Sequence, residues 1–157
     1  MNTLAIRLLR VALVVLLLGS ALAQVLVPVY AGEVGTRFPE VADLVVPYSV
    51  AGILVIACGQ VALLAVWRLL SLVSGGVIFT SRAMRWVDVI TACAAVATIL
   101  GASPMIHLLF FVGVGGPIVL WLAAWLAGGL AFALLMVVMR GLLDAAIADR
   151  TELDEVI

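Results

Sequence analysis

The chain has 157 residues, of which 67% are hydrophobic and 11% are charged, and its formal net charge is −1. A soluble domain carries roughly half apolar and a quarter charged residues, so a chain this short could not hide its apolar surface in an aqueous core. The mean hydropathy of +1.39 agrees. These values exclude an ordinary soluble domain, and we expect an integral membrane protein.

Spanning the hydrocarbon layer takes roughly 20 apolar residues in a helix. Four stretches are long enough: about 5–30, 46–70, 81–110 and 117–142. Backbone polar groups inside lipid must be paired within their own segment, so each stretch is expected to be helical. The predicted fold is an all-α, antiparallel four-helix transmembrane bundle that forms one domain, with an acidic tail over residues 143–157 as a short helical extension.

Arginine placement predicts the orientation of the bundle. In a four-pass arrangement seven of the eight cations fall on one side, and only Arg37 falls on the other. The positive-inside rule then places the N- and C-termini in the cytoplasm. The seven are Arg7, Arg10, Arg68, Arg82, Arg85, Arg140 and Arg150.

The first apolar stretch also resembles a secretory signal. A basic start precedes a short apolar core and the small-residue pattern Ser20–Ala23, which is typical of a cleavage site. Apolar residues nevertheless continue to Tyr30, so the run is long enough to span. We therefore expect an uncleaved helix.

Two glutamines lie inside the first two spans. Gln24 is near the outer edge marked by Tyr30, and Gln60 is near the inner edge marked by Trp67. At 1.5 Å per residue, in a layer of about 30 Å, their depths differ by on the order of 10 Å. Each amide is therefore expected to bond to another helix or to backbone rather than to the other. Pro47 is placed to begin the second helix.

The second and third spans are joined by a glycine-containing segment. Gly75 and Gly76 are expected to end the second helix, and Thr80 or Ser81 can cap the third. The segment lacks the spacing of a phosphate-binding loop, which excludes nucleotide binding of that type.

Asp88 is the only acid within a span, and charges at membrane depth point to function by default. It lies near the cytoplasmic start of the third span, where the helix dipole favours a carboxylate. We predict a charge cluster at the cytoplasmic rim, acting either as a clasp that fixes helix packing or as a proton or ion relay. Its arginines are Arg10, Arg68, Arg85 and Arg140.

His107 lies near the outer end of the third span, after Pro104, which should kink that helix by removing one hydrogen bond. Without Cys, Asp or Glu at ligand spacing, His107 is a poor metal candidate. It is either an interfacial packing residue or a pH-sensitive or quinone-type contact. The segment 113–116 is expected to form a tight turn, with Pro117 beginning the fourth helix.

Small residues recur at four-residue intervals, which lets helices approach closely within one chain or between two copies. They are Cys93, Ala97 and Gly101 on the third span, and Ala124, Gly128, Gly129 and Ala133 on the fourth. The sequence shows no serine–histidine–acid set, no zinc motif and no acid pair within a span. We therefore expect no enzyme activity, no metal and no cofactor.

Two stretches resemble a small bacterial group, the domain of unknown function 2975 family. One runs from Trp67 through the segment 76–80 to Asp88, and the other comprises residues 139–143 with residues 152–157. The resemblance implies a four-span fold in a bacterial plasma membrane. Members of the family are often encoded beside helix-turn-helix regulators, and no catalytic residues are established for them.

The first hypothesis for function is a non-enzymatic interaction or regulatory module. It would contact lipids and a cytoplasmic protein partner, such as a helix-turn-helix regulator, but not nucleic acid directly. The acidic tail is either a solvated helix end or the docking surface for that partner. The second hypothesis is a small oligomeric transporter or channel that uses Asp88, Gln24 or Gln60. An intramembrane enzyme is a distant third.

Overall fold

The computed structural model describes residues 3–39, 42–74, 81–113 and 115–155. Over these ranges the chain forms four long helices, α1 (Thr3–Arg37), α2 (Ala42–Ser74), α3 (Ser81–His107) and α4 (Pro117–Glu155), and no strand. A short π-helix, η2 (Leu108–Val112), extends α3. Each long helix is sufficiently long and apolar to cross a membrane. The all-helical, four-helix part of the predicted fold is confirmed, and the chain is a multi-pass membrane protein.

At the connection between α1 and α2, both helices extend beyond the apolar stretches that were predicted to span the membrane. α1 continues to Arg37 and α2 begins at Ala42. Pro47 consequently lies inside α2, so the prediction that it begins this helix was wrong. A proline in the second turn of a helix removes one hydrogen bond near the end of the ladder, and the chain tolerates this loss. Pro117 does begin α4, as predicted.

α3 begins at Ser81, within the range expected for the third span. The predicted helix break at Gly75 and Gly76 and the cap at Thr80 lie outside the described residues. The turn before α4 contains two glycines with positive φ, Gly113 at 74° and Gly116 at 75°. Glycine adopts this backbone conformation without the Cβ penalty of other residues, which explains why a glycine-rich segment connects these helices.

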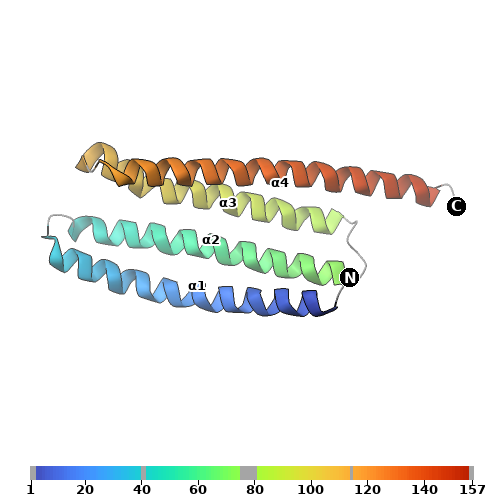
Figure 1. Ribbon diagram of the computed structural model, residues 1–157, viewed down its shortest axis with the longest axis horizontal. Coiled ribbons are helices and arrows are strands. Elements are labelled where there is room, and N and C mark those ends of the chain that lie inside the picture. The colour runs from blue at the N-terminus through green and yellow to red at the C-terminus, as the bar shows by residue number, and fades with distance from the viewer. Residues whose placement is uncertain (1–2, 40–41, 75–80, 114, 156–157) are drawn as a thin grey trace.

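The four helices form an open row rather than a closed ring (Figure 1). α1 packs on α2, α2 on α3 and α3 on α4, and no comparable contact joins α1 to α4 among the described residues. Lipid is as apolar as the helix surfaces, so no hydrophobic force drives the row to close. α1 begins and α4 ends at one end of the row, the termini end, and the α1–α2 and α3–α4 connections lie at the opposite, hairpin end (Figure 1).

Because the row is open, few side chains are buried. The buried apolar residues among those described are Leu13, Ala65, Leu70, Val87, Ile90 and Ala102. Large aliphatic and aromatic side chains are exposed along every helix, as expected for surfaces that contact lipid. Packing is therefore confined to the narrow contact regions between neighbouring helices, which we call seams.

Two glycines allow the close contact between α3 and α4. A Cβ on Gly101 would lie 2.6 Å from the ring of Trp125, and a Cβ on Gly129 would overlap the side chain of Thr98. Trp125 Nε1 also donates a hydrogen bond to Thr98 O at 3.1 Å. Gly128, by contrast, faces open space. Of the predicted small-residue stripes, Gly101 and Gly129 are thus the positions that let these two helices approach closely.

Candidate functional site

Polar side chains form three groups along the row, one at each end and one between them. The central group joins α1 to α2. Gln60 Nε2 lies 3.1 Å from Gln24 Oε1 and 3.2 Å from Ser20 Oγ, and Gln24 Nε2 lies 3.4 Å from Ile53 O. The Ser20 hydroxyl donates to Leu17 O at 2.9 Å. The prediction that Gln24 and Gln60 do not pair was therefore wrong.

Two physical reasons explain this error. The depth estimate took Tyr30 as the end of the first span, whereas α1 continues to Arg37 and so places Gln24 deeper. In addition, Cα–Cβ bonds in a helix tilt toward its N-terminus. Since α1 and α2 are antiparallel, Gln24 leans away from the hairpin end and Gln60 leans toward it, so the two side chains converge.

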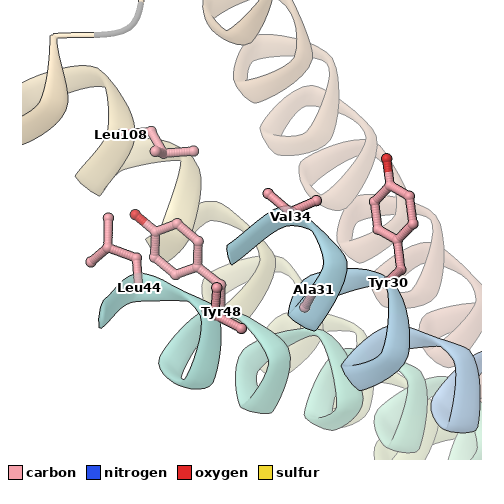
Figure 2. A pocket seen from close by; sticks show the side chains of 7 residues that line it. Tyr30, Ala31, Val34, Leu44, Tyr48 and Leu108 are labelled. Carbon is pink, nitrogen blue, oxygen red and sulfur yellow. The ribbon is translucent and has the colours of Figure 1, made fainter. Parts of the chain in front are cut away.

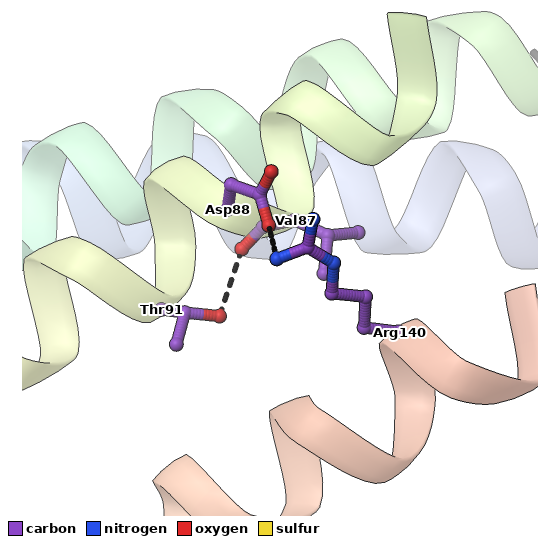
Figure 3. Close-up of polar contacts among 4 residues, drawn as sticks. All are labelled: Val87, Asp88, Thr91 and Arg140. Atoms are coloured by element: carbon purple, nitrogen blue, oxygen red, sulfur yellow. Dashed lines mark hydrogen bonds and ion pairs between the residues drawn. The ribbon is translucent and has the colours of Figure 1, made fainter. Parts of the chain in front are cut away.

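The group at the termini end joins α3 to α4. Arg140 Nη1 lies 2.9 Å from Asp88 Oδ1, with 54% of the Arg140 side chain and 44% of the Asp88 side chain exposed (Figure 3). The Thr91 hydroxyl does not join this pair, because it donates to Val87 O at 2.9 Å (Figure 3). The pair is one exposed ion pair between two helices, and it can fix the position of α4 beside α3.

The remaining arginines of the predicted cluster are not ion-paired with Asp88 in the part of the chain that the structure describes. Arg68 and Arg85 are exposed, on α2 and α3. Arg10 is only partly exposed, and its Nε is buried without a hydrogen-bond partner. The structure therefore brings Asp88 and Arg140 together, and it does not bring Arg10, Arg68 or Arg85 into an ion pair with Asp88.

The group at the hairpin end joins α2 to α3. The Tyr48 hydroxyl lies 2.8 Å from His107 Nδ1. The two rings meet edge to face at a centroid distance of 6.1 Å, and the His107 ring stacks on Phe111 at 4.9 Å. His107 is thus a packing residue that also hydrogen-bonds to the neighbouring helix.

The backbone near His107 is irregular. Pro104 cannot donate to Leu100 O, and the Ser103 hydroxyl donates to that carbonyl at 2.9 Å instead. The α-helix continues to His107 and then widens into η2, which ends where Gly113 N–H bonds to Leu108 O. Such π-helical turns are rare and are frequent at functional sites.

A cavity of about 310 Å³ lies beside Tyr48, between the last turns of α1 and the first turns of α2 (Figure 2). The Tyr48 ring forms one wall, with its hydroxyl turned toward the side on which Leu108 lies, whereas the Tyr30 hydroxyl points away (Figure 2). Apolar side chains dominate the lining, which comprises Tyr30, Ala31, Val34, Leu44, Val45, Tyr48 and Leu108.

Two members of these groups were missed by sequence reasoning. Ser20 was seen only as part of a cleavage pattern, and Tyr48 was not identified as the partner of His107. A serine at a four-residue interval from Gln24 on one helix face was a usable signal. No signal pointed to Tyr48, because its partner depends on how α2 and α3 are aligned.

The described residues contain no group of three His, Cys, Asp or Glu side chains that could hold a metal ion. Cys58 and Cys93 are both free thiols of intermediate exposure.

Comparison with protein families gives a match that covers most of the chain. The family model described as protein of unknown function (DUF2975) matches residues 29–157, which is most of the chain. Comparison with curated proteins and with solved structures gives no significant match.

Proposed function

Since the chain belongs to the DUF2975 family of proteins of unknown function, we propose that it is a non-enzymatic interaction or regulatory module of the bacterial plasma membrane. Both termini would lie in the cytoplasm, on the side that carries seven of the eight arginines. The four apolar helices and the family support the membrane part of the proposal. The interaction part rests on the termini end of the row.

The observation that carries the proposal is the continuity of α4. This helix runs without interruption from Pro117 to Glu155, and its end extends past the start of α3 (Figure 1). Arg140 ties it to Asp88 near that level. Beyond Arg140 the helix leaves the apolar stretch and carries the acids Asp144, Asp149, Glu152, Asp154 and Glu155. A rigid helix that spans the membrane and continues as an acidic segment is suited to hold a partner close to the bilayer.

The partner proposed is a basic cytoplasmic protein. Complementary charge steers association and selects partners, and five acids on the last part of α4 would attract a cationic surface. A helix-turn-helix regulator fits this chemistry, because such proteins present basic surfaces to nucleic acid. Binding to the membrane module would keep the regulator away from its operator.

The experiment is a two-hybrid assay in bacteria between the full chain and a helix-turn-helix regulator of the kind that is often encoded beside members of the family. Replacing Asp149, Glu152, Asp154 and Glu155 by the corresponding amides should abolish the signal and leave membrane insertion intact. The matched control is Arg150→Gln with Thr151→Ala, which alters the same segment but keeps the acids. A signal that survives the amide replacements, or that is absent for the unaltered chain, would count against the proposal.

The transporter or channel hypothesis has weaker support. Gln24 and Gln60 lie between α1 and α2, whereas Asp88 lies between α3 and α4. Within one copy these groups therefore belong to different seams and do not line a common path. A flux assay in proteoliposomes would test this alternative, and a flux that depends on Asp88 would favour it over the interaction module.

A further inference from the structure

Arg10 carries a charge that is only partly accessible. Its Nε is buried without a hydrogen-bond partner, although the side chain as a whole is partly exposed. Of the three guanidinium nitrogens only Nε is buried in this way, so the two Nη groups form the accessible part of the guanidinium. A partly buried charge without a partner is costly, and the enclosure of Nε restricts the direction in which the Nη groups point. Arg10 is therefore an oriented cation without a counter-charge among the described residues.

Arg10 lies on the face of α1 that packs on α2. Ser20 and Gln24 on this face contact Gln60 of α2, and Leu13 is buried. Arg10, Leu13, Ser20 and Gln24 follow one another at intervals that keep them on one side of a helix. The Arg10 side chain consequently belongs to the α1–α2 seam.

The alignment of the two helices places Arg10 near a second arginine. Ser20 and Gln60 lie at one level, because Gln60 Nε2 is 3.2 Å from Ser20 Oγ. Equal numbers of residues separate Arg10 from Ser20 and Leu70 from Gln60, and both helices rise by about 1.5 Å per residue. Arg10 therefore lies at the level of Leu70, near the end of α2, and within about one turn of Arg68.

The termini end of the α1–α2 seam is basic. Arg7, one turn before Arg10 on α1, and Arg68 on α2 are both exposed. The acids within α1 and α2 are Glu33 and Asp43, which lie in the turns at the hairpin end. The acids of the long helices at the termini end are carried by α3 and α4, which lie beyond α2 in the row (Figure 1). Positive charge is thus concentrated on the α1–α2 half of this end.

We propose that Arg7, Arg10 and Arg68, the α1–α2 arginine site, bind the phosphate of an anionic phospholipid. Guanidinium groups donate to phosphate oxygens in a geometry that fits both partners. Leu9 and Val11 beside Arg10 are exposed apolar side chains, so the acyl chains of the lipid can lie along α1 while the headgroup is held. A zwitterionic headgroup fits less well, because its own ammonium group would face three arginines. This site is separate from the acidic segment of α4 to which a protein partner is assigned.

The test is native mass spectrometry of the purified full chain in a non-ionic detergent, with the lipid-bound fraction measured as phosphatidylglycerol is added. Arg10→Gln should weaken binding roughly tenfold, because a charge-assisted hydrogen bond is lost. Arg68→Gln should weaken it roughly fivefold through the loss of one nearby cation. Arg37→Gln is the matched control, since it removes an exposed arginine of α1 at the hairpin end. Its affinity should equal that of the unaltered chain.

Two further ligands distinguish the sources of a phosphate. Phosphatidylcholine with the same acyl chains should bind at least tenfold more weakly, and excess inorganic phosphate should not displace phosphatidylglycerol. Equal binding of the two lipids, or displacement by inorganic phosphate, would overturn the proposal.

The variants decide the location of the site. The proposal is overturned if Arg37→Gln weakens binding as much as Arg10→Gln, or if Arg10→Gln keeps the helical content of the unaltered chain by circular dichroism and also its affinity. If Arg10→Gln does not fold, Arg68→Gln decides, because it alters an exposed position. Unchanged affinity of Arg68→Gln would then overturn the proposal.

Discussion

Gln60 Nε2 donates to both Gln24 Oε1 and Ser20 Oγ, so one amide group of α2 holds two positions of α1. The acceptors lie one helical turn apart on the same face of α1. The amide therefore fixes both the spacing of the two helices and their relative position along the helix axes. Apolar contacts alone would define that position poorly, because neighbouring alignments bury similar surface.

Replacing Gln60 by leucine should consequently weaken the α1–α2 seam. The variant loses both bonds and leaves Gln24 Oε1 without a donor, and interhelical hydrogen bonds in membranes contribute about 1 kcal/mol. The free energy of unfolding should fall by about that amount in a sodium dodecyl sulfate titration in mixed micelles. Val61→Leu, which changes an exposed neighbour, is the control. Equal stability of the two variants would show that the amide bonds contribute nothing measurable.

Asp88→Asn should lower the stability of the α3–α4 seam by less than about 1 kcal/mol, because roughly half of each side chain of the Asp88–Arg140 pair is exposed. Exchanging the two charges, as Asp88→Arg with Arg140→Asp, should recover most of the loss. The measurement is the same titration, with Arg68→Gln as a control that removes an exposed arginine. If Asp88→Asn matches this control, the pair does not act as a clasp, and a proton or ion relay becomes the better interpretation.

Gly128 and Gly129 offer a matched comparison. A methyl group on Gly129 would overlap Thr98, whereas one on Gly128 would meet nothing within 4 Å. Gly129→Ala should therefore push α4 from α3 and cost about 1–3 kcal/mol. Gly128→Ala should be neutral or gain up to about 1 kcal/mol from helix propensity.

The same unfolding titration applies, and Thr98→Ala should partly rescue Gly129→Ala because it removes the overlapping hydroxyl and methyl groups. Equal effects of the two glycine substitutions would contradict the close approach of α3 and α4.

The orientation of the row can be tested with reporter fusions. A reporter after residue 155 should be active in the cytoplasm, and reporters inserted at residues 38–41 and 113–116 should be active outside it. Neutralising Arg68, Arg82 and Arg85 should weaken this preference, because the positive-inside rule acts through arginines near the helix ends. Activity of the terminal reporter outside the cytoplasm would contradict the proposed orientation.

The helices themselves could be predicted from the sequence, because runs of apolar residues long enough to span a membrane are unambiguous. The end of α1 and the start of α2 could not, since α1 continues through polar residues to Arg37 and α2 already begins at Ala42. The starts of α3 at Ser81 and of α4 at Pro117 were predicted, the latter because proline suits the first position of a helix. The open row was also not predictable, since each helix is apolar all round and no face is marked as interior.

Most of the polar residues in the three groups were singled out from the sequence, but only some of their contacts were predicted. Asp88 and Arg140 were expected in one cluster, and they do form an ion pair. Gln24 with Gln60, and Tyr48 with His107, depend on helix alignment and side-chain tilt. Counting residues along each helix takes account of neither the alignment of the helices nor the tilt of the side chains. The count therefore placed Gln24 and Gln60 at different depths.

The open row has a consequence for synthesis of the protein. Among the described residues the extensive contacts between long helices join neighbours in the chain, so each new helix can dock on its predecessor as soon as it leaves the translocon. No early segment has to wait for a late one, and the entropic cost of joining distant parts of the chain is largely avoided. We therefore expect assembly to proceed in order from α1 to α4, with truncated chains retaining the seams already formed.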